Sequence, residues 1–211
     1  SRLVGSEMCI RDSAMADVLT RLFRRLGDEA LSFYYQLKDD SDSDILAAVS
    51  TTSADLRFLD VDMWAENLVE LSNHELPVVR RNLVPSLREY FETFPDDTRK
   101  LLPVMWQDGD EVVRTRMREL LIKMSDISST QFGARITDLN QHGCDLSALW
   151  RLMDARRKGS SEAWKSWLSG EGEMPETIET MRHVSTMQAP EELPDLSEAL
   201  ETLDEELGFL D

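Results

Sequence analysis

The chain has 211 residues and a formal net charge of −18, from 41 acidic and 23 basic residues. No apolar run approaches the roughly 20 residues needed to cross a bilayer, and no signal-peptide pattern is present, so we predict a cytoplasmic protein without a membrane span. The two cysteines, Cys9 and Cys144, are too few for a cysteine-rich zinc site.

The first residues differ from the rest of the chain. Residues 1–13 read SRLVGSEMCIRDS, lack a clear helical or strand period, and resemble translated sequencing-adapter sequence. We therefore expect a non-native leader over 1–14, with Met15 as the natural start. On this interpretation Cys9 is not native, and Cys144 as the single cysteine excludes an internal disulfide.

Helical periods recur along the rest of the chain, whereas strand signals are nearly absent. A first apolar stripe runs from Leu19 to Leu37. We expect Asp17 as its N-cap and Gly27 as a weak point inside this helix. A loop rich in Asp and Ser separates it from a short helix predicted over 44–49.

Two pairs of helices follow. The apolar spacing predicts a first pair over 62–72 and 77–93 and a second pair over 96–107 and 110–124. The second helix of each pair opens with Val-Val-Arg, and these two motifs lie 34 residues apart, at Arg80 and Arg114. Self-similarity at such a period is typical of stacked helix pairs in a helical solenoid.

The pattern weakens and then changes toward the C-terminus. We expect a third helix pair over 128–140 and 145–157, with Asp145 as the N-cap of its second helix. A short helix with Trp164 and Trp167 follows, then a helix from Pro175. The last predicted element is an acidic amphipathic helix, with its apolar stripe at Leu196, Ala199, Leu200, Leu203 and Leu207.

Charge is distributed unevenly along these elements. The net charge is −8 over 15–75, +2 over 76–158 and −12 over 171–211. We therefore divide the chain into a leader over 1–14, a helical repeat domain over 15–158 and an acidic helical C-terminal extension over 159–211. The extension is interpreted as a cap of the solenoid, as an inhibitor that docks on the basic repeat face, or as a partner-binding helix.

The two repeated helices share the pattern Val-Arg-x-x-(Leu/Met)-x-x-x-Leu, at Val79, Arg80, Leu83 and Leu87 and at Val113, Arg114, Met117 and Leu121. This pattern resembles the second helix of HEAT and HEAT-like repeats, over about 62–157. The resemblance implies an all-α fold, a HEAT-like α-solenoid of stacked antiparallel helix pairs. It also implies that the aliphatic residues fill the core and that the arginine holds the turn and forms a ladder between repeats. The spacing equals that of tetratricopeptide repeats, but their Trp, Leu-Gly and Tyr pattern is absent.

Arginines recur on the equivalent helices and form the candidate site. The functional interpretation is an anion-binding face for nucleic-acid phosphates or an acidic peptide. The structural interpretation is an arginine ladder paired with acidic neighbours, including Asp108, Asp110 and Asp126. We predict that the contacts with a partner are made by Arg80, Arg81, Arg114 and Arg118, with Trp106 near the rim.

These observations predict a non-enzymatic scaffold or adaptor that binds a protein or peptide through helices 77–93 and 110–124. Rigid stacked helices present spaced charges at little ordering cost. On this hypothesis, Arg80→Glu combined with Arg114→Glu abolishes binding without lowering stability. The alternative is a nucleic-acid-binding repeat protein masked by its own acidic tail.

Enzymatic interpretations have weaker support. Trp106 and Asp110 are similar to the tryptophan and aspartate of HEAT-like alkylpurine DNA glycosylases, but a predicted turn separates them and the net acidity opposes a DNA enzyme. Cys144 near His142 has the residue types of a nucleophile and base, but the segment is typical of a polar turn. Because metal-binding and phosphate-loop motifs are absent, we predict no catalytic residue, no metal and no cofactor.

Overall fold

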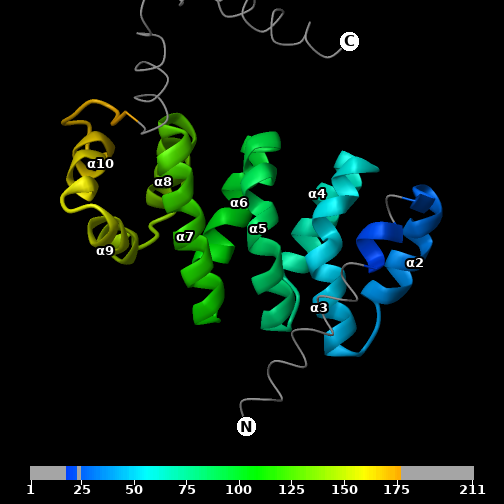
Figure 1. The fold of residues 1–211 in the computed structure, drawn as a ribbon. Helices are drawn as coiled ribbons and strands as arrows, with labels where there is room; N and C mark the ends of the chain where they lie inside the picture. The colour runs from blue at the N-terminus through cyan, green and yellow to red at the C-terminus, as the bar shows by residue number, and fades with distance from the viewer. Residues whose placement is uncertain (1–17, 23–24, 177–211) are drawn as a thin grey trace, which may run out of the picture. The chain divides into compact units, whose positions relative to one another are not determined.

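The computed structural model describes residues 18–22 and 25–176, and all regular secondary structure in these ranges is helical (Figure 1). The predicted all-α class is therefore confirmed for this part of the chain. No helix within these ranges is long and apolar enough to cross a bilayer. The leader and the N-cap at Asp17 lie outside the described residues, as do the last acidic helix and the helix predicted from Pro175 beyond its first two positions, which are not helical.

The described helices lie close to the predicted ones. They are α2 (Asp28–Lys38), α3 (Ser43–Thr52), the 3₁₀ helix η1 (Ser53–Phe58), α4 (Val61–Ser72), α5 (Pro77–Thr93), α6 (Pro95–Trp106), α7 (Glu111–Ile127), α8 (Ser129–Gln141), α9 (Ser147–Arg156) and α10 (Ser160–Leu168). Pro at the first position of α5 and of α6 suits a helix start, since its missing N–H has no intrahelical partner there.

Two predictions about helix boundaries were wrong. Gly27 breaks the first helix instead of only weakening it, because its φ of +53° is left-handed, and α2 begins at Asp28. Asp145 is not the N-cap of α9, which is Leu146. Asp145 still satisfies one free backbone donor at this helix start, since its Oδ1 accepts a 2.8 Å hydrogen bond from the Ser147 N–H.

The 34-residue period extends beyond the two motifs that revealed it. Helices α3, α5 and α7 begin 34 residues apart, and so do α4, α6 and α8. Helices α5 and α7 have 17 residues each, and α4 and α6 have 12 each. Helix α9 departs from the period, because it begins 36 residues after α7.

Helices at equivalent positions pack side by side (Figure 1). One row of contacts joins α3, α5, α7 and α9, and a second row joins α4, α6, α8 and α10. Contacts between α4 and α5 and between α6 and α7 connect the rows. Helix α10 packs against α8 and α9, so residues 160–168 share the core of the helices before them.

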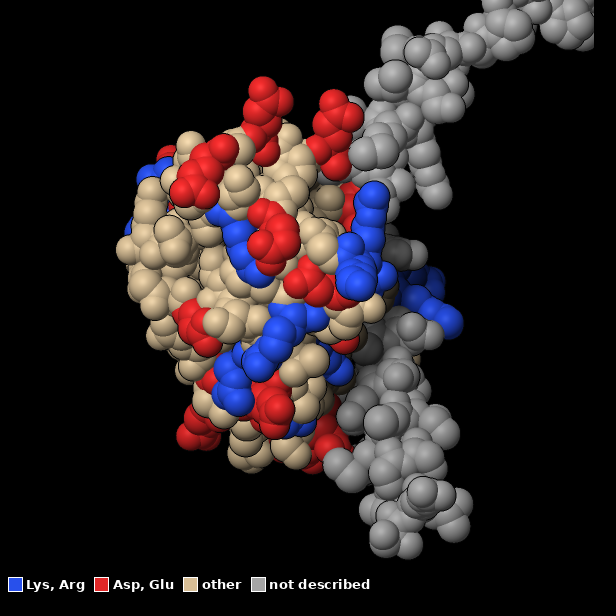
Figure 2. All heavy atoms as spheres, turned by 90° about the vertical axis from the view of Figure 1, so that its left-hand side faces the viewer, with Lys and Arg blue, Asp and Glu red and all other residues tan. Residues whose placement is uncertain are grey.

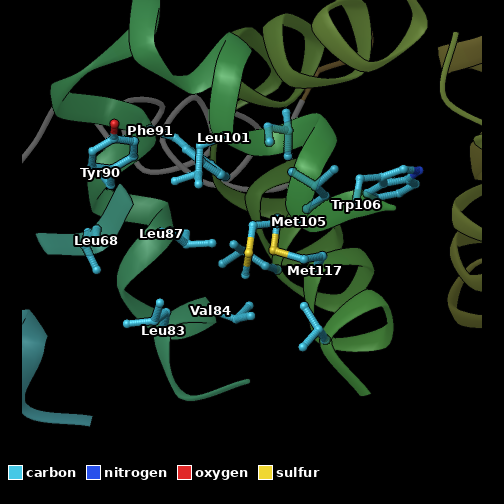
Figure 3. Close-up of a cluster of buried hydrophobic side chains, with 14 of the residues drawn as sticks. Leu68, Leu83, Val84, Leu87, Tyr90, Phe91, Leu101, Met105, Trp106 and Met117 are labelled. Atoms are coloured by element: carbon cyan, nitrogen blue, oxygen red, sulfur yellow. The ribbon is translucent and has the colours of Figure 1, made fainter. Parts of the chain in front are cut away.

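The core lies between the two rows. Figure 3 shows part of it, where side chains from α4 and α5 meet those of α6 and α7, among them Leu68, Leu87, Met105 and Met117. Leu87, Met105 and Met117 are fully buried, as the apolar spacing predicts. In the same view Trp106 lies on the opposite side of the cluster from Leu68.

Candidate functional site

Arg80, in the first turn of α5, makes hydrogen bonds with all three guanidinium nitrogens. Its Nε and Nη2 donate to the two carboxylate oxygens of Asp108, at 2.7 and 2.9 Å. Its Nη1 donates to the backbone carbonyls of His74, at 2.5 Å, and Glu75, at 3.0 Å. The side chains of Arg80 and Asp108 are only 14% and 6% exposed. Arg80 therefore ties the loop before α5 to the loop before α7.

Arg81 makes a second bidentate pair, with Asp110. Its Nε donates to Asp110 Oδ1 at 2.8 Å, and its Nη2 donates to Oδ2. Asp110 is also the N-cap of α7 and accepts a 3.0 Å hydrogen bond from the Val113 N–H. One carboxylate thus links α5 to the start of α7 and satisfies a helix terminus.

These contacts change the acidity of both carboxyl groups. The Arg81 guanidinium holds the pKa of Asp110 far below its ordinary value. Burial by itself would raise the pKa of Asp108, but the hydrogen bonds from Arg80 and from the Asp110 N–H outweigh it and lower that pKa. Both aspartates are therefore ionised at neutral pH, as a charge-assisted pair requires.

Arg114 occupies the equivalent position in α7 and repeats half of this arrangement. Its Nη1 donates to the Asp108 carbonyl at 2.5 Å, just as Arg80 Nη1 donates to the His74 carbonyl. In both helices the carbonyl belongs to the residue six positions before the arginine. The Nε and Nη2 of Arg114 have no hydrogen-bond acceptor among the described residues, so the carboxylate half is missing.

The loop between α8 and α9 explains the difference. The residue 34 positions after Asp108 is His142, which offers no carboxylate. The nearest acidic residue of that loop, Asp145, is exposed and accepts its hydrogen bond from the Ser147 N–H. Arg114, a half-buried residue, therefore keeps two donors without an acceptor, whereas the same two donors of Arg80 bind a carboxylate.

Arg118 lies one turn after Arg114 on the same face of α7. Its guanidinium carbon is 5.8 Å from the ring centroid of Trp106, and its buried Nε has no hydrogen-bond partner in the described structure. Burial lowers the pKa of Arg118, and the neighbouring charges of Arg114 and Arg151 lower it further. Glu111 and Asp145 act in the opposite direction, so three arginines lie close together here with two acidic neighbours.

Our prediction that Trp106 lies near the rim was wrong. The side chain is 4% exposed, and its Nε1 donates to the Asp145 carbonyl at 3.1 Å. The indole ring is covered by the guanidinium group of Arg118, and its hydrogen bond links α6 to the loop before α9. Trp106 supports the arginines but is not itself available to a partner.

Arg151 was missed by the sequence analysis. It is exposed on α9, close enough to Arg118 and Asp145 to influence the pKa of each. The repeat register gave no signal for it, because α9 begins two residues later than a 34-residue period requires.

Charges of both signs are mixed on the face beside α9 and α10. Figure 2 shows blue Lys and Arg side chains lying between red Asp and Glu side chains, without a continuous block of one sign. Among the described residues, no group of three or more His, Cys, Asp or Glu is arranged to hold a metal ion. The site can bind anionic groups by charge-assisted hydrogen bonds.

The geometry thus separates the predicted arginines into two kinds. Arg80 and Arg81 are bound to Asp108 and Asp110, as the structural interpretation expects. Arg114 and Arg118 keep unused donors, and we call these two residues the open arginine pair. Comparison with protein-family models, with curated proteins and with solved structures gave no match for this chain.

Proposed function

We propose that the chain is a HEAT-like helical solenoid that acts as a non-enzymatic scaffold or adaptor and binds an acidic protein segment at the open arginine pair. Three observations support the solenoid: the 34-residue spacing of helix starts, the equal lengths of α5 and α7 and of α4 and α6, and the contacts between helices one repeat apart. In such an array each repeat contacts its neighbours, and the repeated surface is available for binding.

One observation carries the choice of ligand. Arg80 shows which group fits this position of the repeat, since it binds a carboxylate through Nε and Nη2. The same two donors of Arg114 have no acceptor in the described part of the chain. A carboxylate from a partner would therefore take the place that Asp108 takes on Arg80. Arg118 and Arg151 add positive charge beside it.

An acidic protein segment suits this surface better than a nucleic acid. Nucleic acids bind to extended tracts of Lys and Arg that neutralise many successive phosphates. Here Glu111 and Asp145 lie close to the open arginine pair. A few carboxylates spaced along a peptide match two or three arginines separated by acidic residues.

The test is titration of the full chain into a fluorescein-labelled peptide of alternating Glu and Leu residues, followed by fluorescence anisotropy. We expect Arg114→Gln combined with Arg118→Gln to weaken binding by about tenfold or more. Arg156→Gln combined with Arg157→Gln removes the same charge from exposed positions of the α9 end and is the matched control.

Three results would reject the proposed function. One is absence of peptide binding by the natural chain. Another is an equal loss of peptide affinity in the test and control variants, which would indicate a general effect of net charge. The third is tighter binding of a single- or double-stranded oligonucleotide than of the peptide, which would favour the nucleic-acid alternative.

A further inference from the structure

A groove of about 500 Å³ lies between α4 and α6, and neither residue of the open arginine pair lines it. Its apolar lining comes from both helices and from α5, at Ala65, Val69, Tyr90, Leu101 and Val104. Val69 and Val104 are 43% and 51% exposed, although they are the kind of side chain that a core normally covers. The two helices are neighbours in one row of Figure 1.

The next gap in the same row differs in its side chains. Between α6 and α8, Arg135 is buried, and its guanidinium carbon lies 5.9 Å from the Phe91 ring centroid. Asp138 of α8 joins Arg99 of α6 in an ion pair at 3.3 Å. Asp138 stands 34 residues after Val104, so a charged bridge occupies the position where α6 carries an exposed valine.

The charges around the groove restrict what can bind in it. Its lining includes Glu66, Glu70 and Asp97 against one cation, Lys100. Lys38 is bound to Glu70 and Lys100 to Asp97, whereas Glu66 has no partner among the described residues. An apolar floor with an acidic border is complementary to an amphipathic helix that has basic residues beside its apolar stripe.

We infer that the groove between α4 and α6 binds an amphipathic helix of another protein, with an apolar stripe flanked by Lys or Arg. Apolar side chains at helical spacing would cover Val69 and Val104, and a flanking cation would lie near Glu66, the lining acid that has no partner among the described residues. The acidic segment 171–211 of the chain itself, with 13 acids and one base, would bring like charges to this border and is not the occupant. This inference does not rest on the proposed function, because it uses no residue of the arginine site.

The test uses the full chain and a fluorescein-labelled peptide of about 14 residues, in which leucines form one stripe of a helix and lysines the rest. We expect saturable binding that Val69→Lys combined with Val104→Lys weakens by about tenfold or more. Val61→Lys combined with Val112→Lys is the matched control. These valines are 44% and 41% exposed and lie outside the groove, and they add the same two charges.

Each other result would overturn the inference. No binding by the natural chain would show that the groove does not accept such a helix. If the two valine double variants bind the peptide with equally reduced affinity, the peptide does not bind in the groove. Equally tight binding of a peptide with Glu in place of Lys would show that the acidic border of the groove does not select a basic helix. Arg114→Gln combined with Arg118→Gln should leave binding of the basic peptide unchanged, which distinguishes this site from the site for acidic segments.

Discussion

Arg80 and Arg114 occupy the same position in two helices of equal length, yet their guanidinium groups have different surroundings. Both donate from Nη1 to the carbonyl six residues earlier. Arg80 also binds the carboxylate of Asp108 from the next interhelical loop, whereas Arg114 receives no such carboxylate from the loop after α8. The arginine's position in its helix determines the hydrogen bond to the backbone carbonyl. The sequence of the following loop determines whether a carboxylate binds its other two donors.

The largest expected effect is that of Arg80→Gln on stability. The substitution leaves the Asp108 carboxylate buried without its cation and removes two hydrogen bonds to carbonyls. We expect a loss of about 2–4 kcal/mol in the free energy of unfolding. Urea denaturation followed by circular dichroism measures it. This expectation replaces our earlier one that reversing the charges of both arginines leaves stability unchanged.

The second prediction concerns acid. The pKa values of Asp108 and Asp110 are lowered in the folded state. Their ion pairs therefore stabilise the fold above the ordinary aspartate pKa of about 4, and this stability is lost as pH falls below it. The urea concentration at which half of the protein is unfolded should decrease as the pH is lowered from about 5 to about 3.

Arg81→Gln separates the contribution of Asp110 from that of other acids. Without Arg81, the pKa of Asp110 moves back toward its unfolded value, so less stability remains to be lost in acid. The variant should be less stable at neutral pH and show a shallower decrease between about pH 5 and pH 3. Parallel curves for the variant and the natural chain would contradict this assignment.

The fourth prediction tests the contacts of Trp106 that support the open arginine pair. Trp106→Phe removes the Nε1 hydrogen bond to the Asp145 carbonyl and weakens the cation–π contact with Arg118. We expect a loss of about 1–2 kcal/mol in the free energy of unfolding. Trp150→Phe, at a half-buried position of α9, is the control and should cost less. Thermal unfolding of the two variants in parallel makes the comparison.

The smallest effect is expected for Arg114→Gln, the counterpart of Arg80→Gln. It removes one hydrogen bond to a carbonyl and leaves no buried carboxylate without a partner. The free energy of unfolding should decrease by about 1 kcal/mol or less, while binding of the acidic peptide is weakened. A destabilisation as large as that of Arg80→Gln would show that Arg114 is a structural residue and would remove the distinction between the two arginines.

The helices, the 34-residue spacing and the repeated arginine could be predicted from the sequence, because apolar periodicity and the residues at helix starts act within a few positions. The sequence also indicated Asp108 and Asp110 as acidic neighbours of the arginines. It did not determine which arginine each would bind, since Arg80 and Asp108 are 28 residues apart and meet only when α5 packs beside α7.

Tertiary structure decided the remaining features of the site. Trp106 is buried because the loop before α9 folds back to accept its hydrogen bond. Arg151 reaches the site because α9 packs on α7, and the groove beside Val69 and Val104 exists only between two packed helices. A side chain's partners depend on the space that neighbouring repeats leave around it, and this space is not encoded within one helix.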